Sequence, residues 1–195
     1  MAGSNENITI ELVADGNTEQ CRELCNALMA FQKSQAVLSP ESFDQMTYET
    51  RLKASYDNSP VNQLVVAKDC GVPVGYVFST IENVSSGDKS SLPDWAPRLS
   101  DEMKGFYPDW VPDKVGCLNH LYFDPAYRGR GLGSRLLCEA MAWLESFDDV
   151  GVTFVYISNG NKAALDFYLK NGFVFSHDVF GGFIQAAYKK KCGES

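Results

Sequence analysis

Basic residues are in the minority in this sequence. The 195 residues include 17 Lys and Arg against 25 Asp and Glu, which gives a formal net charge of -8 at pH 7. Proteins that bind nucleic acid depend on basic patches that replace phosphate counterions, so we expect no nucleic-acid partner. The acidic balance mildly favours cationic ligands, although solubility alone would also explain it.

Long apolar runs are missing as well. No run approaches the roughly 20 residues that a membrane-spanning helix needs, and residues 1–7 lack the charged and apolar regions of a signal peptide. We therefore expect a cytoplasmic protein that makes no contact with a membrane. A hydrophobic content of 45% allows a sizeable core, and the length suits a single domain of residues 1–195.

Histidine is scarce, because His120 and His177 are the two that the chain contains. The six cysteines are scattered and form no Cys/His array with metal-ligand spacing, so we expect no metal site. A chain of this size also has no need of disulfides. Cys21 and Cys25 lie one helical turn apart on the apolar face of an expected helix, which indicates buried, reduced thiols.

What the chain does contain is a regular alternation of strand-like and helix-like patterns. Strands are expected at residues 8–13, 63–68, 72–78, 116–123, 152–157, 174–180 and 183–188. Helices are expected at residues 17–31, 134–147 and 163–171, and another from Ser39, which would cap it with Pro40 at its first position. The apolar run 152–157 should be buried on both faces and lie parallel to strand 116–123. The pattern predicts one mixed α/β sheet with antiparallel hairpins at both ends.

Residues 83–114 interrupt this alternation. The segment is rich in Ser, Asp and Pro at first and aromatic later, and long loops in compact domains are often functional lids or disordered segments. Trp95 and Trp110 either line a ligand pocket or pack the segment onto the domain, and packing is at least as frequent. We interpret residues 83–114 as an insertion that can serve as a lid.

A glycine-rich stretch separates strand 116–123 from helix 134–147, and it reads Tyr127-Arg128-Gly129-Arg130-Gly131-Leu132-Gly133. Its alternate glycines can take positive φ and bring backbone amides close to a ligand, and the start of the following helix favours a bound anion. The P-loop pattern fails because no Lys-Ser or Lys-Thr follows the last glycine, and the dinucleotide pattern fails because Ser134 replaces its third glycine. A phosphate-binding loop and a tight turn without a ligand remain as alternatives.

Within that stretch, Arg128-x-x-Gly131-x-Gly133 is similar to the Gln/Arg-x-x-Gly-x-Gly/Ala loop of the GCN5-related N-acetyltransferases, the GNAT family. A second similarity follows at the expected distance, and it reads Asn161-x-x-Ala164-x-x-x-Tyr168-x-x-x-Gly172-Phe173. The resemblance is closest over residues 118–173, and the first half of the chain matches mainly by the order of its elements. It implies the GNAT fold, an α/β fold whose mixed, mostly antiparallel sheet is flanked by helices and has a central parallel strand pair splayed for acetyl-coenzyme A (acetyl-CoA).

The resemblance also implies a reaction. An acetyl group would move from acetyl-CoA to a primary amine of a small molecule or peptide, by direct attack in a ternary complex. The residues that would hold acetyl-CoA are Leu121, Tyr122, Phe123, Arg128, Gly129, Arg130, Gly131, Leu132, Gly133, Ser134 and Asn161. A homodimer, which is common in the family, is a further expectation. The alternative is a non-catalytic acyl-CoA sensor or pseudo-enzyme.

Two side chains are expected to carry catalysis. Tyr168 matches the family's usual acid, which would protonate the departing thiolate. An alkylammonium, with a pKa near the lysine value of about 10.4, must lose a proton before it attacks. His120 is the candidate base because an unperturbed imidazole has a pKa of about 6.5; its alternative role is that of a hydrogen-bonded strand histidine. Glu82, acting through water, is a possible substitute.

Asn119 and His120 occupy the positions at which the resemblance to polyamine acetyltransferases of this family would require an acidic pair. Neither residue is acidic. A di- or polyamine acceptor is therefore not favoured, and the sequence leaves the identity of the acceptor open.

Overall fold

Seven strands form one mixed sheet in the computed structural model, which describes residues 7–84 and 107–191. Their order across the sheet is β1 (Ile8–Leu12), β2 (Asn62–Asp69), β3 (Val72–Asn83), β4 (Lys114–Phe123), β5 (Val152–Ser158), β7 (Ile184–Lys190) and β6 (Val174–Val179). β4 and β5 pair in parallel, and the other neighbours pair antiparallel. The expected strands, terminal hairpins and central parallel pair are thereby confirmed.

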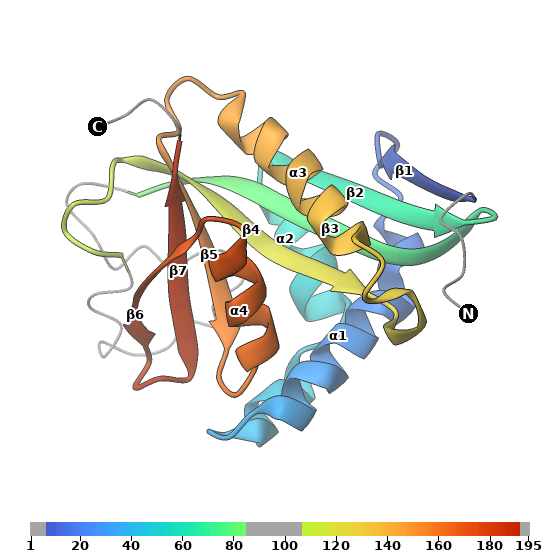
Figure 1. Cartoon of the computed structure of the whole chain (residues 1–195), viewed down its shortest axis with the longest axis horizontal. Helices are drawn as coiled ribbons and strands as arrows, with labels where there is room; N and C mark the ends of the chain where they lie inside the picture. Colours follow the sequence, from blue (N-terminus) through green and yellow to red (C-terminus); the bar gives the residue numbers. More distant parts are fainter. Residues whose placement is uncertain (1–6, 85–106, 192–195) are drawn as a thin grey trace.

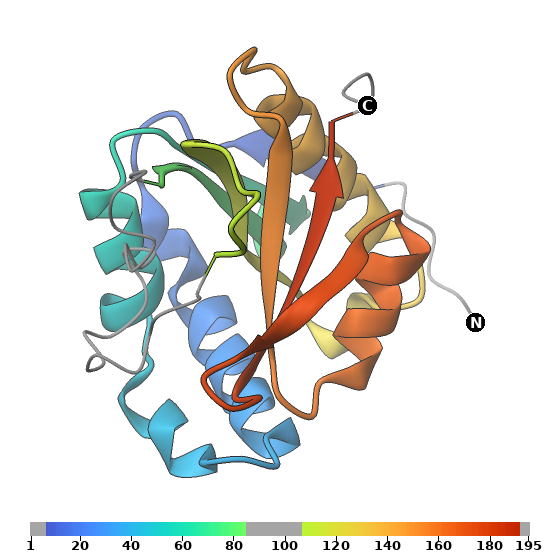
Figure 2. The ribbon, with the colours of Figure 1, turned by 90° about the vertical axis from the view of Figure 1, so that its left-hand side faces the viewer.

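Helices cover both faces of this sheet (Figure 1, Figure 2). On one face lie α2 (Ala54–Asn58) and α1 (Arg22–Gln35), which continues a short turn, η1 (Thr18–Cys21). On the other face lie α3 (Leu132–Glu145) and α4 (Lys162–Lys170). Both long helices bury one apolar face, with Leu24, Cys25, Leu28 and Met29 in α1 and Leu136, Leu137, Ala140, Met141 and Leu144 in α3. None of the helices in the described part of the chain is long and apolar enough to cross a membrane.

The helix that we expected from Ser39 is replaced by short pieces. Ser39 has a left-handed backbone (φ 45°) and makes no side-chain cap. The 3-10 helix η2 (Pro40–Gln45) ends in extended backbone at Met46, and the π-helical turn η3 (Glu49–Lys53) leads into α2. The expectation of one α-helix capped by Ser39 is therefore wrong. Phe43 and Leu52 are both buried but belong to different pieces, so tertiary packing overrides the local helix signal here.

β4 and β5 diverge beyond a short paired section (Figure 1). Pairing between them stops after Leu118, although β4 continues to Phe123. β4 also carries a β-bulge at Asn119. His120 pairs with Phe78 and Leu118 pairs with the next residue of β3, so Asn119 between them has no pairing partner in β3. Bulges bend a strand and re-aim its side chains. The second half of β4 thus has no strand partner on its β5 side, which confirms the expected splayed pair.

The expected insertion, residues 83–114, falls largely outside the described residues, and so does Trp95. In its described part, Tyr107 is buried and makes an edge contact with the ring of Phe154. Trp110 packs on Tyr188, with ring centroids 4.8 Å apart. Of the two alternatives for Trp110, the structure supports packing onto the domain.

Candidate active site

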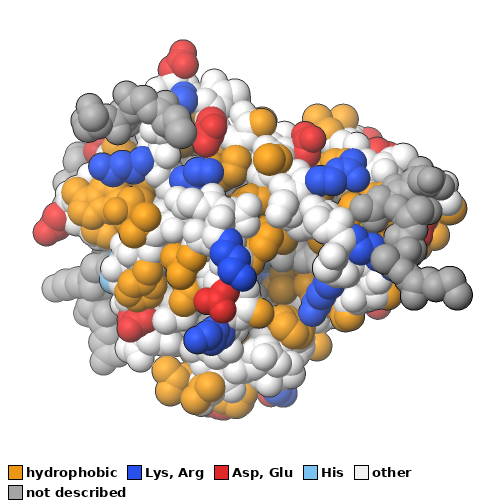
Figure 3. Space-filling model, in the orientation of Figure 1, with side chains coloured by type: hydrophobic (Ala, Val, Ile, Leu, Met, Phe, Trp, Pro, Cys, Tyr) orange, Lys and Arg blue, Asp and Glu red, His pale blue; other side chains and the backbone are white. Residues whose placement is uncertain are grey.

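A groove of about 440 Å³ lies where β4 ends and α3 begins. It brings together ten of the residues expected to hold acetyl-CoA, which are Leu121, Tyr122, Phe123, Arg128, Gly129, Gly131, Leu132, Gly133, Ser134 and Asn161. Leu28 and Phe31 of α1 complete its wall, and sequence reasoning did not identify them. Figure 3 shows that this face of the molecule is hollowed near its centre, with Lys and Arg side chains beside the hollow.

The start of α3 gives the groove an anion-binding end. Gly131, the residue before the helix, has a left-handed backbone (φ 77°), which glycine adopts without steric cost. It provides no side-chain cap, and the first turn of α3 contains no acidic residue. Neither the capping residue nor the first turn of α3 therefore neutralises the first-turn N–H groups and the positive end of this 14-residue helix. A diphosphate is the kind of anion that such a helix start binds, so the residues present fit the pyrophosphate of coenzyme A.

The two arginines of the loop brace its backbone. Arg128 donates from Nε to the carbonyl oxygen of Phe123 at 3.1 Å, and its guanidinium lies 4.8 Å from the ring centroid of Phe31. Arg130, the one expected cofactor residue outside the groove lining, donates to the carbonyl oxygen of Ala126 at 2.9 Å. We therefore expect backbone amides, rather than these side chains, to be the principal anion ligands.

Asn161 has a structural role that sequence reasoning did not include. Its Oδ1 accepts a hydrogen bond from the backbone N–H of Ala164 at 3.2 Å, so the side chain caps the start of α4. Because the cap uses Oδ1, the Nδ2 amide is the group that can reach a ligand in the groove. The expected cofactor contact of Asn161 stays a prediction.

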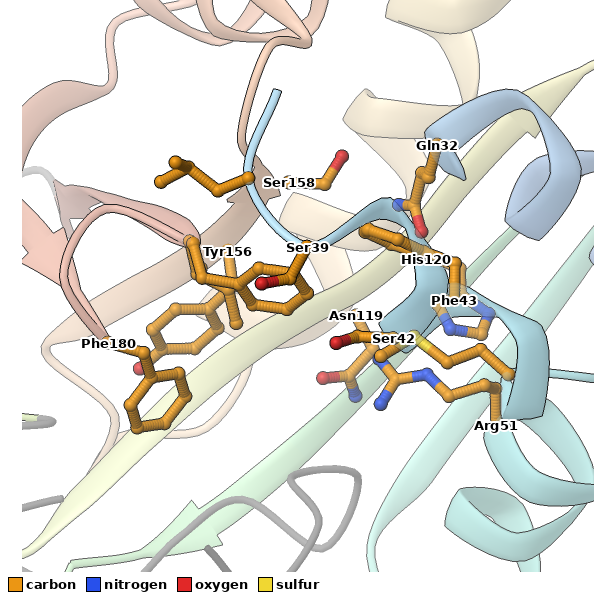
Figure 4. Close-up of a pocket in the computed structure, with 14 residues that line it drawn as sticks. Gln32, Ser39, Ser42, Phe43, Arg51, Asn119, His120, Tyr156, Ser158 and Phe180 are labelled. Carbon is orange, nitrogen blue, oxygen red and sulfur yellow. The ribbon is translucent and has the colours of Figure 1, made fainter. Parts of the chain in front are cut away.

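A second cavity, of about 380 Å³, is enclosed by α1, η2, η3, β4, β5 and the β6–β7 turn (Figure 4). Its lining consists of Gln32, Leu38, Ser39, Ser42, Phe43, Met46, Arg51, Asn119, His120, Tyr156, Ser158, Phe180, Phe183 and Ile184. Sequence reasoning identified two of these as site residues, Asn119 and His120. It missed Arg51 and Ser158, which belong to no recognisable motif.

A narrow space of about 40 Å³ lies between the groove and the second cavity. It shares Asn119, His120 and Ser158 with the second cavity, and Asn161 and Tyr168 with the groove. The two side chains expected to carry catalysis therefore line one small space. Ligands bound in the groove and in the second cavity would meet in this space.

Tyr168 is held in an apolar setting at this junction. Its side chain is buried, with ring centroids 5.3 Å from Phe167 and 5.4 Å from Phe173. Burial raises the pKa of the Tyr168 phenol above its ordinary value of 10. The hydroxyl is therefore protonated at neutral pH and can donate a hydrogen bond or a proton to a group in the groove.

His120 is buried on the other side of the junction, with Nδ1 3.1 Å from the hydroxyl oxygen of Tyr76. Burial, together with the positive charge of Arg51, lowers the pKa of the imidazole to about 3. The sequence-based expectation of an unperturbed pKa is therefore wrong, because it could not include either effect. His120 is neutral at neutral pH and is a weaker base than expected.

The buried neutral imidazole should make stability depend on pH. As pH falls below 6.5, His120 gains a proton in the unfolded chain but not in the folded one, whose pKa is about 3. The stabilising contribution is complete above pH 6.5 and is lost progressively toward pH 3. We expect the free energy of unfolding to fall by about 2 kcal/mol more between pH 7 and pH 5 in wild type than in His120→Gln. Urea unfolding of both proteins measures this difference, and parallel pH dependences would contradict a neutral His120.

Glu82 is linked to the second cavity through two hydrogen bonds. Its carboxylate accepts from Oγ1 of Thr80 at 3.1 Å, and Nδ2 of Asn119 donates to the same Oγ1 at 2.9 Å. Because Thr80 gives its one proton to the carboxylate, Asn119 must direct its NH₂ group to Thr80 and keep Oδ1 for other partners. Glu82 does not belong to the described lining of either cavity, so a role as base would require intervening water.

A groove ending at a helix start, a splayed parallel strand pair and a buried tyrosine at the junction of two cavities define the class of coenzyme A-dependent acyltransferases. The model of the acetyltransferase (GNAT) family matches residues 25–173. The chain belongs to this family, which confirms the resemblance seen in the sequence. A search of curated proteins finds no match.

Solved structures with the same fold include several bound to coenzyme A. The PaiA N-acetyltransferase of Thermoplasma acidophilum in complex with coenzyme A is 17% identical, with 94% of this chain and 98% of that chain covered and a TM-score of 0.63. The NatC complex bound to Gag peptide and CoA is 15% identical, with 94% and 98% covered and a TM-score of 0.59. Arabidopsis thaliana Naa50 with the bisubstrate analogue CoA-Ac-MVNAL is 15% identical, with 94% and 99% covered and a TM-score of 0.56. These similarities concern the fold, and they confirm the expected α/β GNAT architecture.

Proposed function

We propose that the protein is an N-acetyltransferase that moves an acetyl group from acetyl-CoA to a primary amine of a small molecule or peptide. The observation that carries this proposal is the junction at Tyr168, where a groove with an anion-binding helix start borders a second, separately lined cavity. Family membership supports the acetyl-CoA donor. Two of the structural neighbours contain both coenzyme A and a peptide or peptide analogue, which supports an amine acceptor on the far side of the junction.

When bound, acetyl-CoA would supply a thioester whose carbonyl carbon bonds to the amine nitrogen while its C–S bond breaks. Tyr168 would give its hydroxyl proton to the sulfur as the C–S bond breaks, because its raised pKa keeps the phenol protonated until then. The proton that the attacking nitrogen loses would restore the hydroxyl. Leu121 and Phe123 lie on the part of β4 that has no strand partner on its β5 side, where the extended arm of the donor would lie in the manner of strand addition. The amides at the start of α3 hold the pyrophosphate.

His120 has a positioning role in this proposal. With a pKa of about 3, its imidazole holds a proton far less strongly than an alkylammonium does. It can instead form a hydrogen bond with the neutral amine and orient its lone pair. The ammonium proton passes to water before attack, and the positive charge of Arg51 favours the neutral amine inside the cavity.

Thiol release from acetyl-CoA over a panel of amines, amino acids and peptides tests the proposal. We expect time-dependent release with at least one acceptor, together with a mass increase of one acetyl group in that acceptor. Binding of acetyl-CoA without turnover of any acceptor would instead indicate the alternative function, a non-catalytic acyl-CoA sensor. Absence of both binding and turnover would contradict both functions.

A further inference from the structure

The described lining of the second cavity contributes a positive charge, although the protein as a whole is acidic. The chain has a formal charge of -8. Among the described residues that line the cavity there is one arginine, Arg51, and no Asp or Glu. The charge that the described lining contributes is thus opposite in sign to the net charge.

Arg51 is placed where it can bind part of an acceptor. It comes from η3, and Figure 4 shows its guanidinium directed toward the side chains of Asn119 and Ser42. Burial lowers the pKa of Arg51 to about 10, so the side chain is charged at neutral pH. A guanidinium in such a setting binds a carboxylate through short, charge-assisted and often bidentate hydrogen bonds.

Two buried oxygens near the junction call for a hydrogen-bond donor. Oδ1 of Asn119 and Oγ of Ser158 have no hydrogen-bond partner among the described residues. Both residues line the space that leads to Tyr168. Leaving a buried acceptor unpaired is costly, and the N–H groups of an amine would relieve that cost. These oxygens place the amine end of the acceptor beside Tyr168.

Much of the remaining cavity wall is apolar or aromatic, although Gln32, Ser39 and Ser42 also line it. Phe43 and Phe183 contact one another with centroids 5.4 Å apart, and Phe180 and Met46 extend the same surface. A wall of this kind favours an apolar group on the acceptor. The cavity therefore offers three different environments within about 380 Å³, one for an anion, one for an amine and one for an apolar group.

We propose that the acceptor is an amine that also carries a carboxylate and an apolar body, as a hydrophobic amino acid does. This inference rests on the proposed function, because it assigns the acceptor of that reaction. Arg51 binds the carboxylate, Asn119 and Ser158 bind the amine, and the phenylalanines contact the apolar group. A diamine of the same size would place a second cation beside Arg51, and the two like charges would repel each other.

Three acceptors that share one aromatic body test the carboxylate preference, namely L-phenylalanine, L-phenylalaninamide and 2-phenylethylamine. In the wild type, kcat/KM should be highest for L-phenylalanine. Arg51→Gln should reduce the ratio of kcat/KM for L-phenylalanine to kcat/KM for L-phenylalaninamide by about 100-fold, because truncating one partner of a buried charge pair is costly. Arg51→Lys should retain part of this preference. A wild-type enzyme without this preference, or an Arg51→Gln variant that retains it in full, would overturn the inference.

A binding measurement separates this inference from the proposed function. Isothermal titration with 3-phenylpropanoate and its amide, which contain no amine, should show tighter binding of the carboxylate, and Arg51→Gln should abolish the difference. Equal affinity of the wild type for the carboxylate and the amide would overturn the inference, even if Arg51→Gln fails to fold. The acetyl-CoA affinity and the melting temperature of the variant show whether it folds. Turnover of amines without a carboxylate preference would leave the proposed function intact, whereas carboxylate-selective binding without turnover of any amine would refute the proposed function alone.

Discussion

Tyr168→Phe should lower kcat for acetyl transfer by about 100-fold, the loss expected when a general acid is removed. The substitution deletes one hydroxyl and keeps the ring that packs between Phe167 and Phe173. Burial raises the pKa of Tyr168, so the wild-type hydroxyl is protonated at every pH at which activity is measured. The affinity for acetyl-CoA should therefore change by less than about threefold, because the lost interaction is made in the transition state.

Tyr188→Phe is the matched control for this variant. It removes the same hydroxyl from β7, where the Tyr188 ring packs against Trp110, outside the described lining of the groove and the second cavity. In a thiol-release assay, kcat should therefore be about 100-fold lower for Tyr168→Phe than for Tyr188→Phe. An unchanged kcat in Tyr168→Phe would remove Tyr168 from the mechanism.

Gly75→Ala should weaken both the fold and the binding of acetyl-CoA. Gly75 lies opposite Phe123 in the β3–β4 pair, and a Cβ atom added there would come within 2.3 Å of the Phe123 ring. Phe123 is buried and lines the groove, so the ring can move only by distorting the strand or by entering the groove. We expect the free energy of unfolding to fall by about 2 kcal/mol, and the Kd of acetyl-CoA to rise about 10-fold, which corresponds to about 1.4 kcal/mol.

A double-mutant cycle assigns this effect to the Phe123 ring. Phe123→Ala alone removes the atoms that the new Cβ would meet and should itself lower the free energy of unfolding by about 3–5 kcal/mol. Adding Gly75→Ala to it should then cost less than about 0.5 kcal/mol, because the conflict is gone. Fully additive losses in urea unfolding would show that the substitution acts elsewhere.

The lining of the groove, the proposed donor side of the site, was predictable from the sequence because the backbone shapes it. A glycine such as Gly131 is required where the chain takes positive φ before a helix, and this local requirement leaves a pattern in the sequence. The apolar periodicity of α3 and β5 likewise predicted which elements would flank the loop. Only the roles of individual side chains, such as the bracing of the loop by Arg128, needed the structure.

The second cavity, the proposed acceptor side, was not predictable because segments far apart in the sequence build it. The Asn159 side chain accepts from the backbone N–H groups of Val37 and Leu38 at 2.6 Å and donates to the carbonyl oxygen of Phe183 at 3.1 Å. It thereby ties the segment after α1 to the β6–β7 turn across the end of β5. No local sequence pattern predicts such contacts. The same holds for the pKa of His120, which depends on burial and on Arg51 of η3.

Isothermal titration of the protein with acetyl-CoA is the most direct test of the central claim that this chain binds the donor of an acetyl transfer. We predict saturable binding of one acetyl-CoA per chain. Coenzyme A, which contains the same pyrophosphate that the start of α3 would hold, should displace acetyl-CoA. No binding of acetyl-CoA at millimolar concentration would contradict the account.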